Sequence, residues 1–405
     1  MNIHDFSKKF ILNDKIKNID SYLGLRLSEF LREEENLKGT KVGCNAGDCG
    51  SCTVLIDNEA CCSCLITLAK VQNKKVETIE GIKKSELFAK LKDSFSYYGA
   101  AQCGICTPGM LMASVALLRK KNDPSVKEVE EALSGVLCRC TGYRKILQAV
   151  SNVNKRFKKE VSIETTNAVG KRLERLDGKE KIEGTDIFGD DYYPKNSLIA
   201  KIIRSPYNSA KFTFGNIKNW KKNNPGVEII LTAKDIPGIN KFGVIPNFDD
   251  QPALAFEKAK FKGEAVAIIA GDSDTMKDLP LSDFPIHWDP SKDTMDIDEA
   301  LNKNNPNIHD KDIKDNILIV GKVKTGNVDI EENKAFEIEG ELETSYVEHA
   351  YIEPEAGSSW IEGNTLVIQA CTQAPYMDRD DTAKILGLDK NKVRIIIIFC
   401  YFIMT

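Results

Sequence analysis

The sequence predicts an α+β protein with several domains, and three observations support this fold class. Eight of the 12 cysteines form two groups within the first 140 residues. Residues 1–75 combine short strand-like runs with one amphipathic helix, and from Ser85 onward the hydrophobic period becomes helical. Beyond residue 168, strand-like runs return between Pro, Gly and Asn turns. A chain of 405 residues has room for about two to four domains.

The first 75 residues predict a ferredoxin-like β-grasp domain. Strand-like runs lie at Lys9–Leu12 and Thr53–Asp57, and the helix between them has apolar positions at Leu27, Phe30 and Leu31. The loop that carries the first cysteine group is therefore expected to follow this helix.

Residues 85–153 predict four short helices. Thr107 and Pro108 suit an N-cap followed by Pro at the first helical position. Ser125 and Glu128 have the spacing of a capping box. Thr141 is predicted to cap the last helix. Because cysteines stand at or before these helix starts, positive dipole ends would stabilise their thiolates. We expect the second cysteine group to lie among helix N-termini, shielded from water.

The two cysteine groups have the spacing of metal ligands. The first reads C-x4-C-x2-C with a fourth cysteine following, which is the plant-type ferredoxin spacing for a [2Fe–2S] cluster. The second reads C-x2-C followed by C-x-C. Soft thiolates suit iron–sulfur clusters or zinc. The first group consists of Cys44, Cys49, Cys52 and Cys64, and the second of Cys103, Cys106, Cys138 and Cys140.

Two other interpretations of the cysteines are less favourable. A disulfide scaffold is disfavoured because residues 1–20 lack the apolar core and cleavage site of a signal peptide. Zinc also uses C-x2-C spacing, but a zinc ribbon does not need the glycines among the first cysteines, which free backbone N–H groups to turn toward cluster sulfides. Cys371 and Cys400 are expected to be buried apolar residues, as are Cys61 and Cys62. Because Cys61 and Cys62 lie just before Cys64, the fourth ligand of the first cluster is slightly ambiguous.

Three segments carry a family resemblance. Residues 43–55 (GCNAGDCGSCTVL), 101–109 (AQCGICTPG) and 135–144 (GVLCRCTGYR) resemble the iron–sulfur part of the xanthine dehydrogenase/aldehyde oxidase family of molybdenum hydroxylases. The match in order and pattern covers all eight cysteines, over about the first 155 residues. It implies two [2Fe–2S] clusters, with molybdopterin present in the complete enzyme.

The middle of the chain resembles the α/β hammerhead domain of the same family. Strand-like runs lie at Leu198–Ile203, Val227–Thr232 and Ala265–Ala270. The matching motifs are Gly184 with Asp190 and Asp191, then Ile203–Pro206, then Gly263–Val266. Taken singly, Asp190 and Asp191 are an ordinary turn. The helix expected after Gly271 and Asp272 is interrupted by Pro280 and Pro285.

From about Asp310 the chain resembles the beginning of the molybdenum-cofactor domain. The resemblance rests on residues 348–350, 353–356 and 371–373. The resemblance implies that Gln102 hydrogen-bonds the pterin, that Cys140 touches the pterin amino group, and that Gln373 lies near the apical oxygen of molybdenum. For Gln373, the alternative is a polar residue that ends the strand Leu366–Ala370. No catalytic base can be named.

The chain ends in a β-branched, aromatic, uncharged run that includes Ile395–Ile398 and is typical of an aggregation-prone strand. We expect a truncated product or the front part of a split enzyme. The predicted division is 1–76 for the ferredoxin-like domain, 77–157 for the helical [2Fe–2S] domain, 158–168 for a linker, 169–309 for the hammerhead, and 310–405 for the partial molybdopterin-binding domain. No flavin domain separates the iron–sulfur and molybdenum parts.

Composition excludes other classes of function. The net charge of −4 is spread along the chain, with no basic arm for nucleic acid. No apolar run would span a membrane, and no Gly-rich fingerprint offers NAD a site. A cytoplasmic protein is expected.

The resemblance implies hydroxylation of a small aldehyde or N-heterocycle by the complete enzyme, with a flavin or ferredoxin-type electron acceptor. The alternative is a non-catalytic electron-transfer subunit completed by a separate molybdenum-binding chain.

Overall fold

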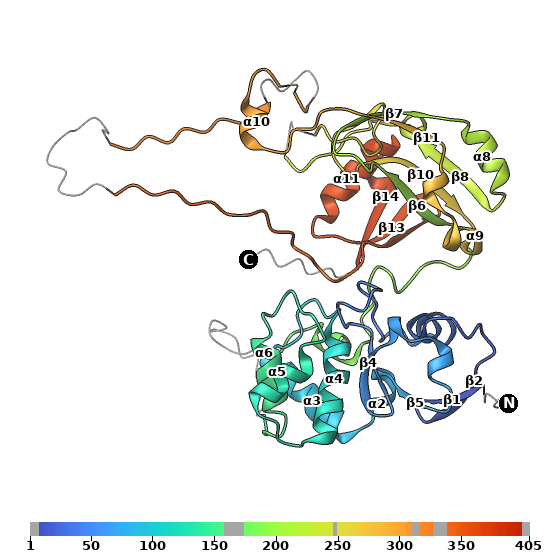
Figure 1. Cartoon of the computed structure of the whole chain (residues 1–405), viewed down its shortest axis with the longest axis vertical. Coiled ribbons are helices and arrows are strands. Elements are labelled where there is room, and N and C mark those ends of the chain that lie inside the picture. Colours follow the sequence, from blue (N-terminus) through green and yellow to red (C-terminus); the bar gives the residue numbers. More distant parts are fainter. Residues whose placement is uncertain are drawn as a thin grey trace, which may run out of the picture.

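The computed structural model describes residues 8–157, 174–245, 249–305, 307–309, 316–326 and 338–398. The described residues form one five-stranded sheet, three three-stranded sheets and a set of short helices, which confirms the α+β class. Figure 1 shows the two cysteine-bearing domains side by side in the lower half and the later regions above them. The predicted linker at 158–168 and Cys400 lie outside the described residues.

The first domain has the predicted β-grasp arrangement. Its sheet has the strand order β2-β1-β5-β3-β4, in which β1 and β5 are parallel and the other pairs antiparallel. The predicted apolar positions Leu27, Phe30 and Leu31 are all buried against this sheet. The helix that bears them is a short α-helical turn, α1 (Leu27–Glu29), which continues as a π-helix at Phe30–Glu34. The strands are β1 (Lys9–Leu12), β2 (Lys15–Asn18), β3 (Thr53–Ile56), β4 (Glu59–Cys62) and β5 (Lys75–Glu77).

The second domain is helical and is built around α4 (Thr107–Lys120). Eleven of the 14 residues of α4 are buried, since neighbouring helices and strand β3 surround it. The capping box of Ser125 and Glu128 is present as predicted. The remaining helices are α2 (Ile79–Ile82), α3 (Glu86–Tyr98), α5 (Val126–Leu133) and α6 (Arg144–Ser151).

Two predicted caps of this domain are wrong. Thr107 is the first helical residue of α4, because Cys106 occupies the N-cap position and Pro108 follows one place later than expected. Thr141 does not cap α6, whose N-cap is Tyr143 in a left-handed conformation. In both cases the chain enters the helix from a cysteine loop, and the geometry of that loop decides which residue stands at the helix start.

The hammerhead region contains two three-stranded sheets, with strand orders β6-β10-β8 and β11-β7-β9. The helix after Asp272, α9 (Ser273–Asp278), ends before Pro280, in agreement with the predicted interruption. The strands are β6 (Ile199–Arg204), β7 (Ala210–Phe214), β8 (Val227–Thr232), β9 (Lys258–Ala259), β10 (Ala265–Gly271) and β11 (Ile286–Pro290), and the other helices are α7 (Gly178–Glu183) and α8 (Ile217–Asn223). The α7 helix precedes these sheets in the chain but packs against the helical domain, where Ile182 joins its core.

The last region has a sheet of order β12-β13-β14 covered by a helix. Two extended arms, residues 316–326 and 338–350, lead away from the body of the molecule and back (Figure 1), and both are largely exposed. The elements are β12 (Gly357–Glu362), β13 (Thr365–Cys371), α11 (Pro375–Leu386) and β14 (Val393–Ile398), and α10 (Ile297–Leu301) precedes the arms. None of the helices in the described ranges combines the length and apolar character that a bilayer crossing requires.

Candidate metal centres

Cys44, Cys49 and Cys52 of the first group lie on the loop between the π-helix Phe30–Glu34 and β3, whereas Cys64 lies in the 3-10 helix Ser63–Leu65 after β4. The loop turns its backbone N–H groups inward. The N–H groups of Ala46 and Cys49 both donate to the Sγ of Cys44 at 3.3 Å, and the N–H of Cys44 donates to the Sγ of Cys49 at 3.4 Å. The loop can curl this tightly because Gly47 and Gly50 adopt positive φ angles of 88° and 69°. The predicted wrapping of backbone donors around sulfur is therefore present before any metal is considered.

The thiols of this group differ in environment. Cys44 is exposed, whereas Cys49, Cys52 and Cys64 are buried. Burial acts to raise the pKa of Cys44, but the N–H donors of Cys49 and Ala46 outweigh it and lower that pKa to about 7. Burial, together with the Cys52 thiol, raises the pKa of Cys64 to about 12. A buried group of thiols that resists ionisation alone favours a bound cation, which would supply the missing positive charge.

Two cysteines compete for the fourth position. Cys52 makes side-chain contacts with Cys62 and also with Cys64. The N–H of Gly47 donates to the Sγ of Cys64, as expected at a thiolate, whereas the Sγ of Cys62 lies 3.9 Å from the carbonyl oxygen of Gly47. This difference in hydrogen bonding favours Cys64 over Cys62 as the fourth metal ligand.

The second group of thiols converges at the start of α4. Cys103 contacts Cys140, Cys106 contacts Cys138, and Cys138 also contacts Cys140. Cys103, Cys106 and Cys138 are between 4% and 8% exposed, as the predicted shielding from water requires, whereas Cys140 is half-buried. The thiols of Cys106 and Cys140 donate to Cys138 and hold its pKa far below the usual value, while donation to Cys138 and burial raise that of Cys106.

Tyr143 and Thr141 hold the loop of the second group in place. The N–H of Cys138 donates to the hydroxyl oxygen of Tyr143 at 3.0 Å. Tyr143 adopts a φ of 64°, which a non-glycine residue rarely does, and its N–H donates to the Thr141 hydroxyl at 3.1 Å. The same hydroxyl lies 3.1 Å from the Sγ of Cys138. Thr141 therefore supports a thiol ligand rather than a helix end.

The donor chemistry of both groups fits iron–sulfur clusters. The thiols of the first group contact one another as two pairs, Cys44 with Cys49 and Cys52 with Cys64. None of the described cysteines forms a disulfide. Four cysteine thiolates are the usual ligand set of a [2Fe–2S] cluster.

The two cysteine loops touch each other directly. The N–H of Leu137, next to Cys138, donates to the carbonyl oxygen of Cys49 at 2.8 Å. Glycines permit this approach, since a Cβ on Gly50 would lie 2.0 Å from the carbonyl oxygen of Gly135, and one on Gly109 would lie 2.6 Å from that of Gly50. An electron could pass between the two groups through this short stretch of backbone.

The second group also contacts the later domains. Phe188 is buried against Cys103 and Cys140, together with Ile352 from the last region. The next residue, Gly189, donates its N–H to the Oε1 of Glu353 at 3.2 Å. The second thiol group therefore lies at the junction with the region that resembles a molybdenum-cofactor domain.

The two glutamines predicted near a pterin and molybdenum have different surroundings. The side-chain oxygen of Gln102 is buried and has no hydrogen-bond partner among the described residues, which leaves an acceptor available to a ligand. Gln373 is exposed just beyond β13. The strand end before it lies close to Gly189, the residue after Phe188, because a Cβ on Gly189 would come 3.1 Å from the Sγ of Cys371.

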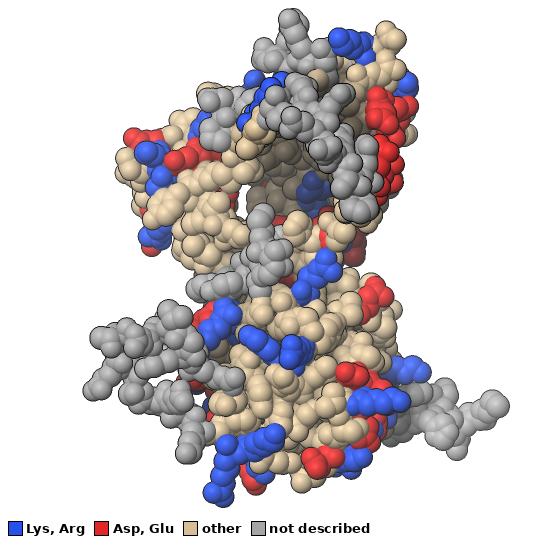
Figure 2. All heavy atoms as spheres, turned by 90° about the vertical axis from the view of Figure 1, so that its left-hand side faces the viewer, with Lys and Arg blue, Asp and Glu red and all other residues tan. Residues whose placement is uncertain are grey.

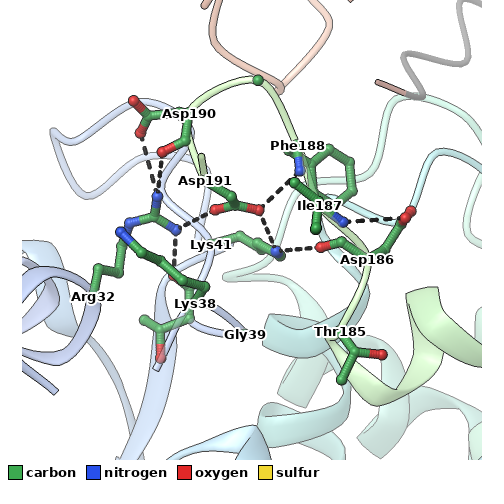
Figure 3. Close-up of polar contacts among 12 residues, drawn as sticks. Arg32, Lys38, Gly39, Lys41, Thr185, Asp186, Ile187, Phe188, Asp190 and Asp191 are labelled. Atoms are coloured by element: carbon green, nitrogen blue, oxygen red, sulfur yellow. Dashed lines mark hydrogen bonds and ion pairs between the residues drawn. The ribbon is translucent and has the colours of Figure 1, made fainter. Parts of the chain in front are cut away.

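An ion-pair network between the first domain and residues 185–191 was missed by the sequence analysis (Figure 3). Asp191 accepts from Arg32 at 2.8 Å and from Lys41 at 2.6 Å. Lys41 also donates to the backbone oxygen of Asp186 at 2.8 Å.

Charge on the surface is mixed. Figure 2 shows basic and acidic side chains distributed over both halves of the face that it displays.

Comparison with known protein families gives four matches in chain order. Each covers one part of the chain. They are the 2Fe-2S iron-sulfur cluster binding domain at residues 10–78, the [2Fe-2S] binding domain at 78–151, the aldehyde oxidase and xanthine dehydrogenase a/b hammerhead domain at 183–290, and the molybdopterin cofactor-binding domain at 308–398.

Individual relatives fall into two kinds. The aldehyde oxidoreductase of Megalodesulfovibrio gigas is 30% identical over 61% of this chain, which spans only 30% of that protein. Small separate subunits match the first domains. One is the xanthine dehydrogenase iron-sulfur-binding subunit of Escherichia coli, which is 42% identical over 33% of this chain and 84% of that subunit. Another is the nicotine 6-hydroxylase small subunit of Paenarthrobacter nicotinovorans, which is 44% identical over 31% of this chain and 74% of that subunit.

The fold matches a solved structure over most of the chain. The aldehyde oxidoreductase from Desulfovibrio gigas superposes with a TM-score of 0.84 at 24% identity, covering 96% of this chain and 45% of that one.

Proposed function

This chain belongs to the xanthine dehydrogenase and aldehyde oxidoreductase family, and from that premise we propose that it carries electrons from a molybdopterin site through two [2Fe–2S] clusters. The observation that carries the proposal is the direct contact between the loop that bears Cys44, Cys49 and Cys52 and the loop that bears Cys138 and Cys140. The hydrogen bond from the N–H of Leu137 to the carbonyl oxygen of Cys49 joins them. Contact between the loops suits electron transfer, since a short path through protein favours passage between centres.

We propose a division of roles among the site residues. The first cluster is held by Cys44, Cys49, Cys52 and Cys64, and the second by Cys103, Cys106, Cys138 and Cys140. Gln102 accepts a hydrogen bond from the pterin, Cys140 touches the pterin amino group, and Gln373 lies on the molybdenum side. The buried, unpaired oxygen of Gln102 supports its role. The exposed position of Gln373 leaves its role resting on the family resemblance.

The proposed domain boundaries are those predicted from the sequence, with the linker at 158–168. In the whole enzyme, the bound molybdenum cofactor supplies oxidative hydroxylation of an aldehyde or N-heterocycle with oxygen from water. The protein residues described above orient the pterin and exclude water from the second cluster. We expect the electrons to pass to a flavin or ferredoxin-type acceptor. We expect the protein to lie in the cytoplasm, where thiols stay reduced.

Iron analysis of the anaerobically purified chain tests the cluster assignment. We expect about four irons and four acid-labile sulfides per chain. Cys49→Ala should remove the spectroscopic signal of the first cluster only, and Cys106→Ala that of the second only. The matched control is Cys61→Ala, because Cys61 packs against the core of the first domain. Zinc in place of iron, or no visible absorption, would overturn the proposal.

A second candidate is a non-catalytic electron-transfer subunit that works with a separate molybdenum-binding chain. It is favoured by the relatives that are themselves small subunits. Molybdenum content and turnover of aldehydes or purines, measured with and without such a chain, distinguish the two. Stoichiometric molybdopterin and turnover in the isolated chain would exclude the subunit role.

A further inference from the structure

A fifth thiol lies beside the first cysteine group, and the four-ligand assignment leaves it without a role. Cys62 is the last residue of β4, where it stands opposite Thr53, the residue after Cys52. Its side chain makes direct contact with that of Cys52. Cys62 is also half-buried.

Cys62 and Cys64 belong to two successive elements. Cys62 ends β4, and Cys64 lies in the 3-10 helix Ser63–Leu65 that follows it. The intervening Ser63 ties this turn to Cys52, because its N–H and its hydroxyl both donate to the carbonyl oxygen of Cys52, at 3.3 and 2.7 Å. The side chains of Cys62 and Cys64 both contact that of Cys52.

Cys62 and Cys64 also reach the same residue of the cysteine loop. Cys64 accepts the N–H of Gly47, and the Sγ of Cys62 lies 3.9 Å from the carbonyl oxygen of Gly47. The two thiols therefore occupy adjacent positions around one glycine.

We propose that Cys62 is a reserve ligand of the first [2Fe–2S] cluster, which binds iron when Cys64 is absent or has dissociated. This inference rests on the proposed assignment of the first cluster. In the exchange, the iron–sulfur bond to Cys64 breaks, the Cys62 thiol releases its proton to water, and its thiolate forms the new bond to the same iron. Cys64 takes up a proton, so no oxidant or reductant is needed.

Three variants of the full chain test the exchange by iron content and electron paramagnetic resonance. Cys64→Ala should retain about four irons per chain, with a changed spectrum for the first cluster. Cys62→Ala/Cys64→Ala should retain about two irons, with an unchanged spectrum for the second cluster. Cys61→Ala/Cys64→Ala is the matched control, since Cys61 lies on the opposite face of β4 and should leave the single-variant result unaltered.

The outcomes separate this inference from the proposed function. If Cys64→Ala loses the first cluster while the second stays intact, or if the Cys62→Ala/Cys64→Ala variant keeps both clusters, Cys62 is not the reserve ligand. If the wild-type chain itself lacks a first cluster, the proposed function fails instead.

A second measurement keeps the test decisive if Cys64→Ala does not fold. Cys62→Ala keeps all four primary ligands, but it should lose iron from the first cluster to a chelator several times faster than the wild-type chain. Cys61→Ala should lose iron at the wild-type rate. Equal rates for Cys62→Ala and the wild-type chain would overturn the inference.

Discussion

The ammonium group of Lys41 lies 2.6 Å from the carboxylate of Asp191, 150 residues later in the chain, and both side chains are almost completely buried. Arg32 approaches the other oxygen of the same carboxylate at 2.8 Å (Figure 3). Burial acts to raise the pKa of Asp191, but the two cations outweigh it and hold that pKa below its usual value. This carboxylate docks the first domain onto the segment that leads into the hammerhead.

Asp191→Asn should weaken this docking strongly. The amide would leave Lys41 and Arg32 buried without an anionic partner, which typically costs about 3–5 kcal/mol. Hydrogen exchange should show a fall of this size in the opening free energy at the amide of Phe188, which donates to Asp191 at 2.9 Å. The matched control is Asp190→Asn, because the Asp190 side chain is 56% exposed and 3.5 Å from Arg32, so the effect should be about 0–1 kcal/mol. Equal effects of the two changes would contradict this explanation.

Gly109→Ala should disturb the contact between the two cysteine domains. The added methyl group would lie 2.6 Å from the carbonyl oxygen of Gly50, and such overpacking costs about 1–3 kcal/mol. This loss should appear in thermal unfolding even though Ala favours an isolated helix by about 0.5–1 kcal/mol over Gly. Gly135→Ala is the control, since its Cβ would meet no atom within 4 Å. A Gly109→Ala variant as stable as the control would show that the close approach is not required.

Lys181→Met should lower the reduction potential of the second cluster. The Lys181 side chain is fully buried, its stem packs on Gly104, and its charge lowers the pKa of Cys103. Removing a buried positive charge makes an added electron less favourable. In a redox titration the first cluster serves as an internal reference, and Lys179→Met, an exposed position of the same helix, is the control. A potential that rises, or an equal shift of both clusters, would disprove the role of Lys181.

Limited proteolysis should cut the extended arms before any cluster domain. Lys322 and Lys324 are exposed sites for trypsin in residues 316–326, and residues 338–350 are exposed throughout. We therefore expect early cleavage there and a coloured, protease-resistant fragment that contains about the first 157 residues, since both cysteine domains have their own buried cores. Early loss of colour, with the arms intact, would be the opposite result.

Local features could be predicted from the sequence because short-range chemistry decides them. The capping box of Ser125 and Glu128 depends on two residues of one turn, and it is present. The burial of Leu27, Phe30 and Leu31 follows from their spacing alone. Thr141 was misassigned because its residue type suits a cap, while the φ of Tyr143 moves the helix start two residues further on.

The expected aggregation at Ile395–Ile398 remains a prediction. In the structure these residues belong to β14, which lies at one edge of its sheet and pairs in parallel with β13. Ile398 is buried, whereas Ile397 is 44% exposed.

The sequence by itself determined the ligand chemistry of this protein, because thiol type, cysteine spacing and loop glycines are local and survive in any arrangement of the domains. Only the tertiary structure decided what surrounds those ligands. It brought Asp191 to Lys41, placed Phe188 against Cys103, and set Cys62 beside Cys52. The physical reason is that burial and charge pairing depend on distances in space between segments that lie far apart in the chain, and no hydrophobic period or residue spacing records such distances.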